Sequence, residues 1–198
     1  MIDVRVLVVD NGGQWTHREW RTLRDLGVDT KIIPNTVFFQ EIVDENVDGL
    51  VLSGGAPRVG LTGELGNCGE YLEKAVFPVL GICAGHQYMA RFFGGEVKPS
   101  ETPEFGKVEL KILKQDVLFE GVPEKSIVWE SHNDEVTRLP SVFEILAESE
   151  DCKIQAMKHR DKPFYGLQFH PEVEHTEYGE QIFKNFINIC KKNKLEVI

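Results

Sequence analysis

A cysteine between two glycines is the part of this sequence best suited to chemistry. Cys83 lies in Gly81-Ile-Cys-Ala-Gly85, directly after a run of apolar, β-favouring residues. Glycines beside a nucleophile permit the strained strand-to-helix turn that holds its side chain out of the sheet. A helix that starts at Ala84 would also point unpaired N–H groups and its positive dipole end at the sulfur, which favours a thiolate. The pattern predicts a nucleophilic Cys83, although a small buried cysteine at a strand end would fit the same residues.

A thiolate nucleophile needs a proton carrier, and the best candidate lies in Gly166-Leu-Gln-Phe-His-Pro-Glu172. An apolar run there ends at His170, and Glu172 follows two residues later. An imidazole can hold the cysteine proton and later protonate a leaving amine, while a carboxylate fixes the tautomer and orientation of the ring. We therefore predict that Cys83, His170 and Glu172 act together.

His170, Glu172 and His175 also raise the question of a metal site. In the zinc-protease pattern H-E-x-x-H the two histidines are one helical turn apart. His170 and His175 are instead five residues apart, with Pro171 between them. The spacing argues against a metal, and we expect neither a metal nor a cofactor in this chain.

Composition and charge narrow the class of protein. The 198 residues are 41% hydrophobic and 27% charged, which is typical of one globular domain, and we expect residues 1–198 to form it. A net charge of −10 opposes nucleic-acid binding, which needs a basic surface. The longest apolar run, near residues 75–85, is shorter than the ~20 residues that span a bilayer. Four cysteines without a C-x-x-C pair favour reduced thiols in the cytoplasm.

In the first half of the chain, predicted strands alternate with predicted helices, and these elements would position Cys83. Short β-rich runs are followed by amphipathic stretches, which is typical of βα units around a parallel sheet. The expected strands are 4–9, 30–33, 49–53 and 79–81. The expected helices are 16–26, 37–46, 66–76 and 84–93. Thr16 is the expected cap of the first helix, and Glu19 falls with other charged residues outside that helix's apolar positions.

The second half of the sequence is richer in strands. Short alternating runs separated by turn residues predict strands at 107–113, 126–130, 143–147, 153–158 and 164–169. Residues 177–192 should form a closing helix, with Ile182, Phe183, Phe186, Ile187 and Cys190 as its apolar stripe. The predicted fold class is α/β, with a mostly parallel central sheet flanked by helices and a strand-rich second half.

Three separated segments together resemble the class I, triad-type glutamine amidotransferases. They are Gly81–Gln87, which reads G-x-C-x-G-x-Q, then Ser53-Gly54-Gly55, and His170-Pro-Glu172. Their order and spacing match over nearly the whole chain. The resemblance implies a flavodoxin-like fold and a triad in which Cys83 attacks the carboxamide of glutamine. By the same resemblance His170 transfers protons, Glu172 orients His170, water hydrolyses the thioester to glutamate, and a synthetase receives the ammonia.

This resemblance also implies roles for backbone groups. Attack on an amide places negative charge on its oxygen, which preset N–H donors must stabilise. The resemblance implies an oxyanion hole made by the backbone around Gly54 and Gly55 and by the N–H of Ala84. It also implies that Gln87 contacts the amino-acid end of the substrate. Taken alone, Ser-Gly-Gly would be an ordinary loop.

Two further segments narrow the resemblance to the GMP synthetases. Asp10–Thr16 is similar to the D-x-G-x-Q-[YW]-T opening of their amidotransferase part, and Trp129–Asp134 is similar to their W-x-S-H-x-D segment. That second segment helps to hold glutamine, so the implied substrate-binding residues are Ser131, His132 and Asn133. Asn133 replaces the usual glycine, and Asn11 and Gly13 alter the opening. On the residues alone, the second segment would fit a polar loop equally well.

The sequence contains no glycine-rich phosphate loop, so ATP chemistry would belong to another polypeptide. The resemblance implies a glutaminase subunit whose ATP-pyrophosphatase partner binds ATP and magnesium, adenylates XMP and accepts ammonia. Three alternatives stay open. One is an amidotransferase for another acceptor such as chorismate, although Leu52-Ser-Gly-Gly-Ala56 lacks the proline of those loops. The others are a cysteine hydrolase of related fold and a non-catalytic binding protein.

Overall fold

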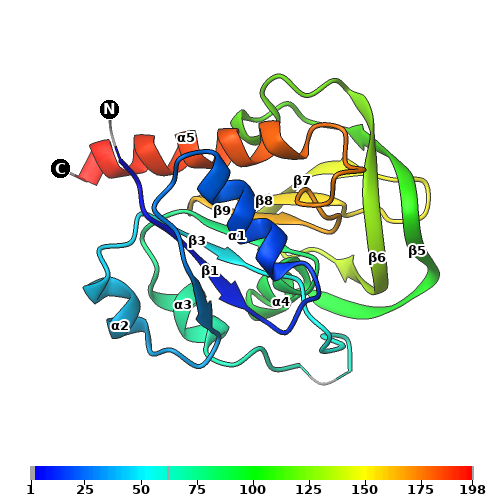
Figure 1. Cartoon of the computed structure of the whole chain (residues 1–198). Helices are drawn as coiled ribbons and strands as arrows, with labels where there is room; N and C mark the ends of the chain where they lie inside the picture. Colours follow the sequence, from blue (N-terminus) through cyan, green and yellow to red (C-terminus); the bar gives the residue numbers. More distant parts are fainter. Residues whose placement is uncertain (1–2, 62, 198) are drawn as a thin grey trace.

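A computed structural model describes residues 3–61 and 63–197. Within them, nine strands join one sheet in the spatial order β2-β1-β3-β4-β9-β8-β7-β5-β6 (Figure 1). The strands are β1 (Val6–Asp10), β2 (Ile32–Pro34), β3 (Gly49–Leu52), β4 (Val79–Ile82), β5 (Glu96–Ile112), β6 (Lys125–Arg138), β7 (Phe143–Glu148), β8 (Ala156–His159) and β9 (Phe164–Leu167). The helices are α1 (Thr16–Asp25), α2 (Phe39–Asp44), α3 (Cys68–Lys74), α4 (Ala84–Phe92), α5 (Gly179–Val197) and the short 3-10 turn η1 (Val117–Phe119).

The first half of the chain forms the parallel part of the sheet. β1 pairs in parallel with β2 and β3, and β4 pairs in parallel with β3 and β9. The inner strands β1, β3 and β4 are buried on both faces: Val6 and Val8 of β1 enter one apolar cluster, and Leu7 and Val9 enter the other. Successive side chains of a strand point to opposite faces of the sheet, so one continuous apolar run contributes to the core on each face.

The prediction of a mostly parallel sheet is only partly confirmed. Among the described strands, four neighbouring pairs are parallel and four are antiparallel. A parallel pair needs a crossover of a dozen or more residues, whereas antiparallel strands can be joined by a short turn. Only residues 160–163 separate β8 from β9, so these strands pair antiparallel. The strands of the second half therefore pair antiparallel with one another, while β9 also pairs in parallel with β4.

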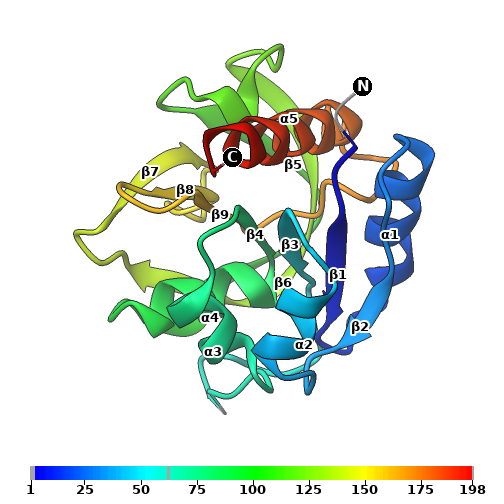
Figure 2. The same ribbon diagram turned by 90° about the vertical axis from the view of Figure 1, so that its left-hand side faces the viewer.

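Helices cover both faces of the parallel part. In Figure 2, α1 and α5 lie on one side of the strands, and α2, α3 and α4 lie on the other. The predicted apolar stripe of α5 is confirmed, because all its members are buried in the cluster that also holds Leu23 of α1. The cluster on the opposite face contains Ile42 of α2, Tyr71 of α3 and Met89 of α4.

Two local predictions are wrong. Thr16 is the first residue of α1 and not its cap; the cap position belongs to Trp15, whose side chain makes no capping bond. The Thr16 hydroxyl instead bonds to Asp10 Oδ1 at 3.1 Å and to Gly13 O at 3.2 Å. The predicted strand 126–130 is too short, because β6 also contains residues 131–134, where the sequence leaves a polar loop open as an alternative. β5 and β6 are longer than their apolar runs and pair along most of their length.

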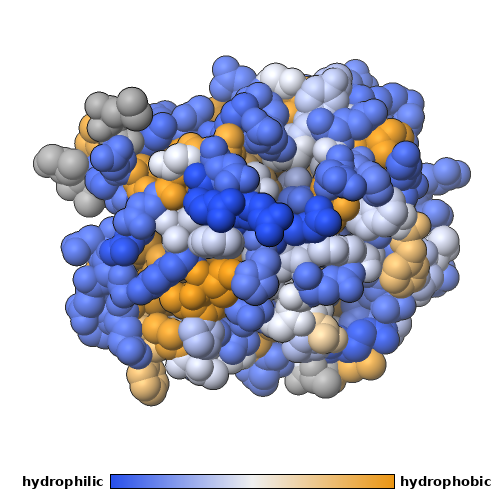
Figure 3. Space-filling view, in the orientation of Figure 1, coloured by the Kyte–Doolittle hydropathy of each residue, from blue (hydrophilic) through white to orange (hydrophobic). Residues whose placement is uncertain are grey.

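The surface view fits an acidic, charged chain. In the orientation of Figure 3, the most hydrophilic residues lie across the middle of the molecule, over α1. The two ends of the chain lie close together in Figure 1, where Lys194 Nζ donates to the carbonyl of Asp3 at 2.8 Å. None of the helices in the described part is both long and apolar enough to cross a membrane.

Candidate active site

Cys83 occupies the sharp turn between β4 and α4. Its backbone has φ 50° and ψ −106°, and besides it only Asn46 has a positive φ among the described non-glycine residues. Such a conformation costs about 1–3 kcal/mol and persists only where neighbouring structure enforces it. A Cβ on Gly85 would collide with the carbonyl of Leu52, and one on Gly81 would lie 2.7 Å from the Gly85 backbone. Both glycines are therefore needed for the turn.

His170 follows β9 and faces Cys83 across Gly54. A Cβ added to Gly54 would lie 3.2 Å from His170 Cε1 and 3.5 Å from Cys83 Cβ, so the two side chains meet at this glycine. The His170 backbone is held at both ends: its N–H donates to Trp129 O at 2.9 Å, and its carbonyl accepts from the Thr176 hydroxyl at 2.7 Å. The structure thus brings together two residues that are 87 positions apart.

Glu172 fixes the orientation of the His170 ring. Its Oε1 lies 2.6 Å from Nδ1, which must donate because an ionised carboxylate can only accept. Trp15 packs edge-on against the ring, with 4.6 Å between ring centroids. Nε2 has no hydrogen-bond partner within residues 3–61 and 63–197. The nitrogen that a proton transfer would use is therefore the one left available.

Charge around His170 favours its protonated form. Burial opposes a charged imidazole, but the Glu172 carboxylate and the Cys83 sulfur outweigh burial and hold the pKa of His170 well above its ordinary value. A protonated imidazole beside a sulfur atom stabilises the thiolate by direct charge interaction. The arrangement therefore favours an imidazolium at His170, next to the sulfur of Cys83.

The predicted oxyanion residues line the same cavity, whose volume is about 330 Å³. Gly54, Gly55 and Ala84 are all on its wall. Ala84 is the first residue of α4, so its N–H has no acceptor inside the helix. Cavities of this size suit small ligands. Backbone N–H groups and the sulfur thus border one space that can hold an amino acid.

Asn11 and Gly13, which depart from the usual opening motif, shape the Gly54–Gly55 loop. The Asn11 N–H donates to the Ser53 hydroxyl at 2.9 Å, and its side-chain amide donates to the Ser53 carbonyl at 3.0 Å. Gly13 lies so close to this loop that a Cβ on it would be 2.5 Å from Gly54 O. These two residues therefore fix the position of the Gly54–Gly55 loop.

The predicted substrate-binding residues also line the cavity, in different ways. The backbone carbonyl of Ser131 lies 3.8 Å from Cys83 Sγ, and Asn133 is exposed at the rim. His132 is buried, with Nδ1 2.9 Å from the Asp134 carbonyl and Nε2 2.8 Å from Glu104 Oε2. Both nitrogens of that ring therefore face protein groups. Direct binding of substrate by His132 stays a prediction.

Gln87 lines the cavity from the first turn of α4, but its amide nitrogen is already used by the protein. Nε2 lies 2.6 Å from the Asp134 carbonyl and 3.0 Å from Gln168 Oε1. Asp134 is in turn paired with Arg58, whose Nε lies 2.9 Å from its carboxylate. Substrate binding by Gln87 would therefore use its amide oxygen or its backbone, and it stays a prediction.

A buried acid, Glu19, lines the cavity against expectation. It lies in the first turn of α1 and is 1% exposed, although its position falls outside the apolar spacing of that helix. Burial and the nearby Glu172 carboxylate raise the pKa of Glu19 well above its ordinary value, against opposing effects of His170 and the Gly54 backbone. A single acid in a stretch rich in charges carries no sequence signal of burial. Only the position of α1 over the cavity explains it.

The buried acid and histidine groups do not form an open metal site. His175 is exposed and packs on Trp129, with ring centroids 4.8 Å apart, so it does not join His170. Among the described residues, the donor atoms of Glu104, His132 and Cys152 lie within 4.8 Å of one another. Glu104 already accepts from Ser149 at 2.6 Å and from Gln155 at 2.8 Å. The Glu104 carboxylate is therefore already occupied by hydrogen bonds from protein groups.

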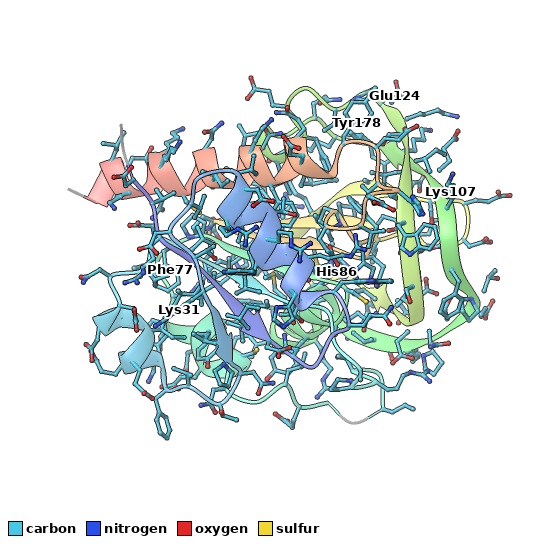
Figure 4. The ribbon with its side chains drawn as sticks, in the orientation of Figure 1. Lys31, Phe77, His86, Lys107, Glu124 and Tyr178 are labelled. Atoms are coloured by element: carbon cyan, nitrogen blue, oxygen red, sulfur yellow. The ribbon has the colours of Figure 1, made fainter. Side chains whose placement is uncertain are left out.

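One histidine of the cysteine segment belongs to the core. His86 follows Gly85 in α4, is fully buried, and has Nε2 3.1 Å from the carbonyl of Ile154. Burial lowers the pKa of His86 to about 3, so the ring is neutral. Figure 4 shows His86 in the interior, whereas Lys107 and Glu124 lie at the outer edge near β5 and β6. His86 therefore packs the elbow from behind and is not a proton carrier.

Comparisons with known proteins agree with this geometry. Residues 7–190 match the family model described as glutamine amidotransferase class-I. A subunit of the glutamine-hydrolysing GMP synthase of Thermoplasma volcanium is 50% identical over 196 residues, covering 98% of this chain and 96% of that protein. The corresponding GMP synthase subunit of Pyrococcus abyssi is 51% identical over 185 residues, covering 93% of this chain and 98% of that protein.

Solved structures support the same relationship. A crystal structure of a protein described as a GMP synthase subunit from Thermoplasma acidophilum has a TM-score of 0.93 at 48% identity and covers 98% of each chain. A glutamine amidotransferase from Thermotoga maritima has a TM-score of 0.74 at 22% identity, covering 99% of this chain and 85% of that one. The second similarity is one of fold alone.

The buried acid gives a prediction about stability. A carboxyl group whose folded pKa is raised stabilises the fold fully below its unfolded pKa, near 4.3, and loses that contribution as pH rises towards the folded pKa. Glu19→Gln removes this loss. We expect the variant to gain stability relative to the parent between pH 4 and pH 7, by at most about 1.4 kcal/mol per pH unit. Urea unfolding at pH 4, 5.5 and 7 measures the difference; a difference that does not change with pH would contradict the buried, protonated acid.

Proposed function

Because this chain belongs to the class-I glutamine amidotransferase family, we propose that it hydrolyses glutamine to glutamate and ammonia at the cavity around Cys83. The observation that carries the proposal is the position of the His170 ring. Nδ1 is held by Glu172, Nε2 is unpartnered among the described residues, and the ring adjoins Cys83 at Gly54. This is the arrangement that proton transfer between a sulfur nucleophile and a leaving amine requires.

The first half of the reaction forms a thioester. The Cys83 thiolate attacks the carboxamide carbon of glutamine, and negative charge develops on the amide oxygen. Backbone N–H groups of Gly55 and Ala84, with the Gly54 backbone beside them, stabilise that charge. The C–N bond then breaks while His170 Nε2 gives its proton to the nitrogen. Ammonia leaves, and the glutamyl group stays on sulfur.

The second half regenerates the enzyme. Water attacks the thioester carbon, and neutral His170 accepts a proton from it. The C–S bond breaks with its electron pair on sulfur, which restores the thiolate and releases glutamate. Glu172 holds the ring in one orientation through both steps, since its 2.6 Å contact to Nδ1 leaves Nε2 directed at the reacting atoms.

The ammonia goes to a synthetase subunit that converts XMP to GMP. The relatives that support this are named as subunits of the glutamine-hydrolysing GMP synthase and match over nearly their full lengths. The partner would be an ATP-pyrophosphatase subunit that binds ATP and magnesium, and this chain would bind neither. Ammonia becomes ammonium in neutral water and is then no longer a nucleophile, so an enclosed route to the partner would keep it reactive.

We place the protein in the cytoplasm, where its four buried, free cysteines would stay reduced.

Loss of the sulfur should abolish glutamine hydrolysis. We expect Cys83→Ala to lower kcat by at least about 10³-fold, because no other group can form the acyl intermediate. Glutamate release from glutamine measures the effect. Cys190→Ala is the matched control: this thiol of α5 is also buried but packs against Gly49 and does not line the cavity, so the variant should stay within about threefold of the parent. Hydrolysis at the parental rate by Cys83→Ala would refute the mechanism.

The acceptor needs a separate experiment. The chain is mixed with the synthetase subunit from its own organism, glutamine, ATP, magnesium and XMP, and GMP is measured. We expect GMP to form with glutamine and to be lost in Cys83→Ala, while added ammonium chloride restores it. Glutaminase activity without any GMP would leave the hydrolysis intact and reject the assignment of XMP as acceptor.

A further inference from the structure

Gln168 is a buried amide beside the sulfur that has no role in the reaction described above. It directly precedes Phe169 and His170, and its side chain is fully buried. Gln168 follows the last residue of β9, Leu167, so it lies between that strand and His170. Gln168 Nε2 lies 3.7 Å from Cys83 Sγ, a normal distance for a hydrogen bond to sulfur.

A chain of hydrogen bonds fixes which end of this amide faces the sulfur. The two ends of a glutamine amide are told apart only by their partners. The backbone carbonyl of Asp134 can only accept, so the Gln87 atom 2.6 Å from it is the nitrogen. The other hydrogen of that nitrogen points to Gln168 at 3.0 Å, which must present its oxygen there. The NH₂ group of Gln168 therefore faces Cys83.

The main chain keeps Gln168 in this position. Its backbone N–H donates to the carbonyl of Gln155 at 2.8 Å, and two residues later the N–H of His170 donates to Trp129. The far end of the amide chain is anchored by the pair of Arg58 with Asp134. Hydrogen bonds thus hold both the backbone and the side-chain amide of Gln168. The donor is therefore preorganised.

Two neighbours of the sulfur have opposite effects on it. The Ser131 carbonyl at 3.8 Å can only accept, so it favours the protonated thiol. The Gln168 amide can donate, so it favours the thiolate. A hydrogen bond to an ionised group is roughly twice as strong as one between neutral groups. The hydrogen bond from Gln168 therefore stabilises the sulfur most when the sulfur is a thiolate.

We propose that Gln168 is a catalytic residue that donates a hydrogen bond to the Cys83 thiolate, with Gln87 as the positioning residue that orients its amide. The inference rests on the proposed glutamine hydrolysis. The donor acts twice: it stabilises the attacking thiolate, and it stabilises the sulfur again when the C–S bond breaks and the electron pair returns to it. His170 supplies and accepts the protons in both steps, and Gln168 exchanges none.

The test is the pH dependence of Cys83 alkylation by iodoacetamide, followed by mass spectrometry of the peptide that contains Cys83. Gln168→Met keeps the size of the side chain and removes the donor. A hydrogen bond to a charged group is worth enough to move the midpoint of alkylation upward by about one to two pH units. We also expect kcat for glutamine to fall at least about tenfold, with KM within about threefold of the parent.

A second variant and a control separate this role from damage to the fold. Gln87→Met leaves Gln168 in place but frees its amide, so the alkylation midpoint should move in the same direction by a smaller amount. Asn185→Leu removes another buried amide, which donates to Leu118 and Glu120 carbonyls under α5, and should leave the midpoint unchanged. Urea unfolding of each variant shows that it is folded.

The outcomes are distinct. Midpoints of Gln168→Met and Gln87→Met that coincide with the parent's overturn the proposal. An upward shift in Asn185→Leu as well would show a general effect of destabilisation and would also overturn it. Because alkylation does not require turnover, a chain that fails to hydrolyse glutamine yet shows the expected shifts would reject the proposed function while keeping the hydrogen bond.

Discussion

The site depends on one backbone conformation, the positive φ of Cys83 between β4 and α4. This turn places the sulfur beyond the end of a buried strand, next to the first free N–H of a helix and opposite His170. Close packing offsets its cost: Gly81 and Gly85 leave no room for a Cβ, and Leu52 and His86 press on the elbow from two sides. A parallel sheet buried on both faces supplies that rigidity.

Electrostatics then decides how the sulfur and the imidazole share a proton. Glu172 and the sulfur both favour a charged His170 against the effect of burial. Burial raises the pKa of Glu19 beside them, which favours its neutral form on the cavity wall. The amide chain from Asp134 through Gln87 to Gln168 ends in one donor at the sulfur, the Nε2 of Gln168. Each group is buried, which makes its contribution larger than it would be in water.

The sequence predicts the local features of this structure better than those that depend on contacts between distant segments. Cys83 between its glycines, and the strand β9 that leads to His170, follow from local propensity and spacing. The antiparallel half is harder to predict, because the register of β5 with β6 depends on pairing between distant segments and not on the apolar runs alone. Burial of Glu19 and Gln168 does not follow from the sequence, since tertiary contacts set the burial of a polar side chain and a single sequence offers no periodic signal for it.

The central claim is that Cys83 and His170 form a thiolate–imidazolium pair. ¹⁵N NMR of the His170 ring, followed across pH in the parent chain and in Cys83→Ala, tests it most directly. The pair predicts a ring that carries both protons at neutral pH in the parent and that loses the second proton at lower pH once the sulfur is removed. A ring that is neutral at pH 7 in the parent, with the same titration in the variant, would contradict the account.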